Sequence, residues 1–99
     1  MSDEMAQVRA ALQRLKSRGG PTVQAHGHSA NHRAELEASD VVGCFYCCET
    51  YAPSRVNAWI DDGTTALCPL CGIDSVVGDA SGYPAGDPQF LKQMNGVWF

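Results

Sequence analysis

The sequence lacks a long hydrophobic run and is poor in large apolar residues. Leu, Ile, Val and Phe together make up only 19 of the 99 residues, so the 44% hydrophobic content depends on alanine and cysteine. No run of about 18 apolar residues is present, which excludes a membrane-spanning helix. The acidic start, Met1 to Glu4, lacks the basic and then apolar pattern of a secretory signal. We therefore expect one small cytoplasmic domain without a disulfide framework, stabilised by more than its core.

Basic residues are scarce beyond residue 33. Residues 34–99 contain nine acidic residues against Arg55 and Lys92, a net charge of −7, whereas residues 1–33 carry a net charge of +3. Contacts to phosphate dominate the affinity of proteins for nucleic acids. The acidic body therefore argues against nucleic-acid binding, and the basic residues near the N-terminus are best interpreted as a solvated helix face.

Residues 1–18 are predicted to form an amphipathic helix that starts after Ser2 as N-cap. Two heptads are too short for a stable coiled coil alone, so the helix must dock on the body, on a second copy of the chain in a homodimer, or on another protein. Gly19-Gly20-Pro21 ends it. Its apolar stripe consists of Met5, Val8, Leu12 and Leu15, at spacings of three and four residues.

The remaining chain divides into two parts. Residues 19–40 are expected to form a histidine-containing linker or ordered loop, with a helical turn around Leu36. Residues 41–99 are expected to form a domain. Asp87 followed by Pro88 predicts a capped helix over residues 88–95 that buries Phe90, Leu91 and Met94. An apolar tail over residues 97–99 is expected to pack back onto the body. Three other elements are expected: a short helix after Pro53 with Ser54 as cap, carrying Val56, Trp59 and Ile60; a strand over residues 64–67; and a partner strand over residues 73–77.

The cysteines carry the strongest chemical signal. Two Cys-x-x-Cys pairs are separated by twenty residues, and each two-residue gap lets both thiolates of a pair face one metal ion. Gly72, directly after the second pair, suits a turn that needs positive φ. A closed four-cysteine site leaves no open coordination position, so it predicts a structural metal rather than an enzyme. The predicted ligands of one zinc ion per chain are Cys44, Cys47, Cys68 and Cys71.

Iron is the alternative metal. The second pair, from Cys68 to Gly72, is similar to the second loop of rubredoxins, which would make the chain an electron-transfer protein. The first pair departs from that family because Cys48 stands where rubredoxins have glycine, and the spacer is shorter. Cys48 itself is interpreted as a small buried apolar residue, with a reactive thiol or a ligand of a second site as the alternatives.

The histidines suggest a second alternative, a divergent His-Asn-His nuclease or a nucleic-acid-binding zinc finger. His26, His28 and Asn31-His32 all precede the cysteines, whereas such nucleases place the catalytic histidine between or after the cysteine pairs. The order therefore argues against this class. A glycine-flanked exposed loop is the simplest interpretation, and a weak transition-metal site at His26 and His28 is an intermediate one.

The chain also resembles a family of small bacterial cytoplasmic proteins of unknown function. The resemblance covers most of residues 32–99 and rests on the segments 43–47, 59–63, 65–76 and 78–84, together with His32-Arg33, Phe90-Leu91 and Trp98-Phe99. It implies a cytosolic location and a zinc-ribbon-like or treble-clef-like fold. We therefore expect an α+β zinc-ribbon-like domain with N-terminal and C-terminal helices, acting as a protein-interaction module.

Overall fold

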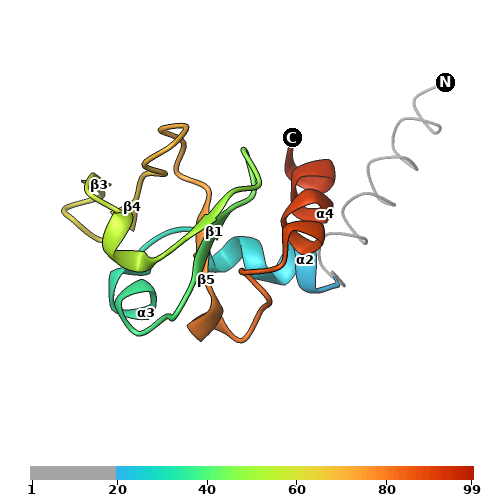
Figure 1. The fold of residues 1–99 in the computed structure, drawn as a ribbon, viewed down its shortest axis with the longest axis horizontal. Coiled ribbons are helices and arrows are strands. Elements are labelled where there is room, and N and C mark those ends of the chain that lie inside the picture. The colour runs from blue at the N-terminus through green and yellow to red at the C-terminus, as the bar shows by residue number, and fades with distance from the viewer. Residues whose placement is uncertain (1–19) are drawn as a thin grey trace, which may run out of the picture.

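A computed structural model of the chain, which describes residues 20–99, contains two small antiparallel sheets surrounded by short helices (Figure 1). The larger sheet has the strand order β2 (Thr50–Tyr51), β1 (Val42–Cys44), β5 (Val76–Gly78), and the smaller one pairs β3 (Trp59–Ile60) with β4 (Thr65–Ala66). This confirms a small α+β fold. The helices are α2 (Pro21–Gln24), η1 (Ala25–His28), α3 (Arg33–Glu37), η2 (Pro53–Arg55), η3 (Asp79–Ser81) and α4 (Pro88–Trp98).

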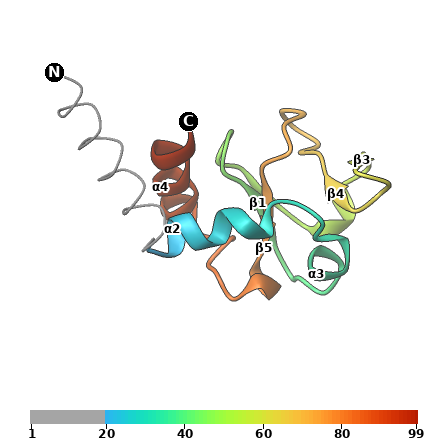
Figure 2. The ribbon, with the colours of Figure 1, turned by 180° about the vertical axis from the view of Figure 1, so that it is seen from behind.

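The larger sheet separates two apolar cores because side chains alternate between its faces. α4 and α2 lie on one side of the sheet, and α3 with the β3–β4 pair lies on the other (Figures 1 and 2). The core on the α3 side, called the cysteine core here, contains Leu36, Val42, Cys44, Tyr51, Val56, Ala66, Cys68 and Val76. The core on the α4 side, called the helix core, contains Ala25, Phe45, Val77, Ala85, Phe90, Leu91 and Met94.

Gly43 lets α4 approach the sheet closely. It lies in β1 opposite Val77, on the face that carries the helix core. A Cβ atom at this position would collide with the carbonyl oxygen of Ala85 and the side chain of Leu91. The missing side chain of Gly43 therefore sets the distance between β1 and α4.

The C-terminal helix is longer than predicted. Asp87 caps α4 by accepting a hydrogen bond from the backbone N–H of Gln89, and the three predicted core residues are buried, as expected. The helix continues through Trp98, so the predicted end near Asn95 was wrong. The expected packing of the last residues onto the body is present, because Trp98 packs against the helix core and the Phe99 ring lies 5.8 Å from that of Phe45. Trp98 also donates its indole N–H to the carbonyl oxygen of Thr22, which ties the last turn of α4 to α2.

Residues 20–40 pack against the sheets. The expected helical turn around Leu36 is confirmed as α3, and Ala25 and Leu36 are buried in the two cores. His32 is also buried: its Nδ1 donates to the carbonyl oxygen of His28 at 2.6 Å, and its Nε2 accepts from the backbone N–H of Ala66 at 3.0 Å. The segment expected as a linker or loop is therefore helical and joined to β4, although the domain boundaries themselves stay predictions.

Two predicted elements in the middle of the chain were wrong. The helix after Pro53 is only the single turn η2, and Trp59–Ile60 forms strand β3 instead of continuing it. The strand that follows the second cysteine pair, β5, pairs with β1 and not with β4. The predicted strand over residues 64–67 is present as β4, and its partner is β3.

The predicted helix over residues 1–18, with its apolar stripe, lies outside the described residues. Within residues 20–99, no helix combines the length and the apolar character needed to cross a membrane.

Candidate metal centre

The first cysteine pair forms a tight turn at the end of β1. The backbone N–H of Cys48 donates to the carbonyl oxygen of Cys44 at 2.7 Å, and the N–H of Cys44 donates to the carbonyl oxygen of Glu49 at 3.0 Å. The turn aims the N–H of Tyr46 at the Cys44 sulfur, 3.4 Å away. Cys48 closes the turn with a left-handed φ of 62°. This is the first knuckle, residues 44–48.

The second cysteine pair repeats the same turn. The N–H of Gly72 donates to the carbonyl oxygen of Cys68, and the N–H of Cys68 donates to the carbonyl oxygen of Ile73, both at 2.9 Å. The N–H of Leu70 points at the Cys68 sulfur at 3.4 Å, and Gly72 has the positive φ, 80°, that its position predicted. This is the second knuckle, residues 68–72. Each of its bonds matches one in the first knuckle, so the two are related by approximate symmetry.

The two knuckles bring the four predicted cysteine ligands together. All four Sγ atoms lie within 4.8 Å of one another. The sulfur of Cys44 is 3.6 Å from that of Cys71, and the sulfur of Cys47 is 3.8 Å from that of Cys68. Four sulfurs bound tetrahedrally to zinc at about 2.3 Å are roughly 3.8 Å apart. The group could therefore hold a metal ion with little rearrangement, and all five cysteines are free thiols rather than disulfides.

Two hydroxyl groups that the sequence analysis missed lie beside this cluster. The hydroxyl of Ser75 is buried 3.0 Å from the Cys44 sulfur. Tyr51 is buried in the cysteine core near Cys68, and its hydroxyl makes no hydrogen bond of ordinary geometry within residues 20–99. A thiolate at Cys68 would give that hydroxyl an acceptor, which is a second sign that the cluster fits a metal. Their spacing in the sequence could have pointed to them, because each hydroxyl residue follows the first cysteine of its own knuckle by seven residues.

Burial is the largest influence on the pKa values of Cys47, Cys68 and Cys71. Burial raises the pKa of the Cys71 thiol to about 11 and that of Cys47 still further. Burial also acts to raise the pKa of Cys68, but the Tyr51 hydroxyl and the backbone N–H groups of the second knuckle outweigh it and lower that pKa to about 7. A bound dication favours the thiolate form of each sulfur that it coordinates.

Cys48 is adjacent to the cluster but is not part of the four-sulfur group. Its side chain is partly buried and packs against the helix core. Burial raises the pKa of its thiol, and the nearby Cys44 contributes in the same direction. These contacts are those of a small apolar residue.

The histidines and Asn31 make contacts away from the cysteines. His28 pairs with the carboxylate of Glu35 at 2.9 Å, and the His26 ring stacks on that of Trp98 with 3.8 Å between centroids. Asn31 accepts a hydrogen bond from the Thr64 hydroxyl at 2.9 Å. His32 is buried, contrary to the expectation of an exposed loop, and both of its ring nitrogens are engaged within the fold. Among residues 20–99, the four cysteines form the one group of three or more side chains arranged to hold a metal.

No protein-family model, curated protein or solved structure matches the chain. The resemblance to small bacterial cytoplasmic proteins therefore stays a prediction.

Proposed function

We propose that this chain is a small zinc-binding protein that holds one structural zinc ion at Cys44, Cys47, Cys68 and Cys71. The spacing of the four sulfurs carries this proposal, since the two cross-knuckle distances of 3.6 and 3.8 Å are those of a tetrahedral thiolate site. When bound, zinc would supply folding free energy, roughly 10–16 kcal/mol in zinc-finger peptides. All four positions around the ion are taken by sulfur, which favours a structural role over catalysis.

The proposed fold group is zinc-ribbon-like or treble-clef-like. Both knuckles lie next to short antiparallel strands, and the sulfurs of one turn lie 3.6 and 3.8 Å from those of the other. A core with so few large apolar residues depends on such a cross-link. Zinc is favoured over iron because the first knuckle has Cys48, not glycine, at its closing position.

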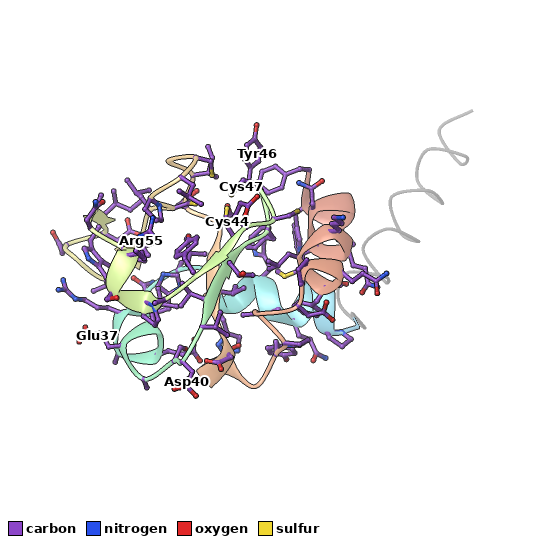
Figure 3. The ribbon with its side chains drawn as sticks, in the orientation of Figure 1. Glu37, Asp40, Cys44, Tyr46, Cys47 and Arg55 are labelled. Carbon is purple, nitrogen blue, oxygen red and sulfur yellow. The ribbon has the colours of Figure 1, made fainter. Side chains whose placement is uncertain are left out.

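We further propose that the protein acts in the cytoplasm by binding another protein or a second copy of itself. Support comes from apolar side chains exposed at the knuckles: Tyr46 is 47% exposed and Leu70 is 55% exposed, at the same position of the two turns. Figure 3 shows Tyr46 projecting away from the body, beyond Cys44 and Cys47. Phe99, 62% exposed, meets the Tyr46 ring edge-on. Exposed apolar side chains that adjoin one another, as Tyr46 and Phe99 do, are typical of protein-binding surfaces.

Elemental analysis of the purified protein tests the metal. One zinc per chain is expected, and replacing any of the four ligands by serine should lower that content, whereas Cys48→Ser should leave it unchanged. Less than half a zinc per chain, or a red protein that contains mainly iron, would overturn the assignment. Metal-dependent cleavage of plasmid DNA would favour the nuclease alternative instead.

The interaction role is tested by light scattering and by capture of partners from cell lysate. Deleting residues 1–18 should leave zinc binding intact but lower the apparent mass or abolish capture. Tyr46→Ser combined with Leu70→Ser tests the knuckle surface in the same assays, with Arg55→Ser, an exposed residue of η2, as control. If the deletion removes the zinc-bound fold, the helix belongs to the core and its proposed role in binding fails.

A further inference from the structure

The hydroxyls of Tyr51 and Ser75 occupy equivalent positions in the two halves of the metal centre. Tyr51 follows Cys44 by seven residues and Ser75 follows Cys68 by seven residues. Each lies at one end of the strand that follows its knuckle: Tyr51 is the last residue of β2, and Ser75 directly precedes β5. Both strands pair with β1. The approximate symmetry of the two turns therefore extends to these two side chains.

The contacts of the two hydroxyls cross from one knuckle to the other. Ser75, which follows the second knuckle, lies 3.0 Å from the sulfur of Cys44 in the first. Tyr51, which follows the first knuckle, is buried in the same core as Cys68 of the second knuckle, and its buried hydroxyl has no hydrogen-bond partner among residues 20–99. A backbone hydrogen bond from Phe45 to the carbonyl oxygen of Ser75, at 3.0 Å, holds the two halves in this crossed register.

The four sulfurs are thus divided into two kinds. Cys44 and Cys68, the first cysteine of each knuckle, are buried. The Ser75 hydroxyl lies 3.0 Å from the Cys44 sulfur, and Tyr51 is buried in the same core as Cys68. Cys47 and Cys71, the second cysteines, are partly exposed. Within residues 20–99, no side-chain hydroxyl forms a hydrogen bond with either of them.

We propose that Tyr51 and Ser75 are positioning residues that donate crossed hydrogen bonds to the metal-bound thiolates of Cys68 and Cys44. This inference rests on the proposed zinc site. A metal-bound thiolate has no proton, so the hydroxyl must be the donor in each pair. The bond spreads the negative charge of a buried sulfur, and hydrogen bonds to charged acceptors are stronger than those between neutral groups. Groups that orient metal ligands in this way typically change metal affinity 10- to 100-fold when they are removed.

A purely structural role for Tyr51 predicts a different result. A buried hydroxyl without a partner costs stability, so replacing Tyr51 by Phe would then leave metal binding unchanged and stabilise the fold. If the hydroxyl serves the Cys68 thiolate, the same substitution weakens metal binding. Tyr51→Phe keeps the ring in the cysteine core, so it separates the role of the hydroxyl from that of the ring.

The test uses the full chain with cobalt(II) in place of zinc, together with competition for zinc by a chromophoric chelator. The wild type should show the sulfur-to-cobalt charge-transfer bands of a tetrahedral tetrathiolate site. In Tyr51→Phe and in Ser75→Ala these bands should move to longer wavelength, because a thiolate that loses a hydrogen bond gives up its electrons more easily. Each variant should also bind zinc roughly tenfold or more weakly, and the double variant should bind zinc more weakly than either single variant.

Two variants control for the loss of a hydroxyl elsewhere. Ser39→Ala removes a buried hydroxyl that bonds Glu35 and Ala80, and Tyr83→Phe removes one that bonds Gln24. Both should keep the wild-type bands, and Ser75→Thr should restore them. If the wild type forms no tetrathiolate cobalt site, the proposed zinc function fails and this inference fails with it. If the wild type forms the site but Tyr51→Phe and Ser75→Ala keep its bands and zinc affinity, the inference alone is overturned.

Discussion

Cys48 and Gly72 close the two knuckles at the same position, with φ values of 62° and 80°. Both residues follow the second cysteine of their pair and donate a backbone hydrogen bond to the first. Glycine adopts this left-handed conformation freely, whereas a residue with a Cβ atom does so at a cost. The chain therefore carries backbone strain in the first knuckle that the second knuckle avoids.

Substitutions at these two positions should have opposite effects. Gly72→Ala should lower the free energy of unfolding by about 1–2 kcal/mol, since an added Cβ meets no atom within 4 Å and the whole cost is conformational. Cys48→Gly should be more stable than Cys48→Ala by about 1 kcal/mol, because it relieves the same strain. Denaturant unfolding of the zinc-loaded variants measures both. Equal stability of Cys48→Gly and Cys48→Ala would show that the first knuckle is unstrained.

His32 should make the fold sensitive to mild acid. Burial lowers its pKa below the ordinary value of 6.5, so the unfolded chain takes up the proton more readily than the folded one. The stabilising contribution of the neutral ring is complete above pH about 6.5 and is lost as the pH falls toward the folded-state pKa. An NMR titration of the histidine rings should place the pKa of His32 below 6.5. A value above 6.5 would contradict this prediction.

The sequence predicted the local parts of this structure better than the distant pairings. Each knuckle is formed by five adjacent residues, and the Asp87 cap by three, so short-range patterns were sufficient for both. The pairing of Cys44 with Val76 depends on how the two knuckles meet in space, and this overrode the expected pairing of neighbouring strands. The sequence pattern predicts an exposed His32. Its burial could not be predicted from nearby residues, because it depends on a hydrogen bond with Ala66, 34 residues away.

Removing the metal should unfold more than the knuckles. Cys44 and Cys68 are buried members of the cysteine core, and Cys47 and Cys71 pack against it. The helix core shares strands β1 and β5 with it, through residues such as Val77. A chelator should therefore collapse the dispersed amide NMR signals of residues 20–40 as well as those of residues 41–99, and added zinc should restore them. A chelated, metal-free sample that keeps its native dispersion would show that the two cores are sufficient without metal.

The cysteines should react with an electrophile in a defined order. N-ethylmaleimide adds to a thiolate: the sulfur forms a bond to carbon, the alkene carbon takes a proton from water, and the zinc–sulfur bond breaks. Exposure favours attack at Cys47 and Cys71, whereas Cys44 and Cys68 are buried beside hydroxyl donors. In a Cys48→Ser background, mass spectrometry of the first adduct should therefore find it on Cys47 or Cys71.

Removing one hydroxyl should change that order in a predictable way. Without its donor, the Cys68 thiolate holds more charge and becomes a better nucleophile, so Tyr51→Phe in the same background should increase the share of the first adduct on Cys68. Ser75→Ala should do so for Cys44, and Tyr83→Phe should change neither share. Because Cys44 and Cys68 stay buried in all of these variants, a shift toward the expected sulfur reports the lost hydrogen bond and not a change in exposure. An unchanged order in both variants would mean that burial alone protects the two sulfurs.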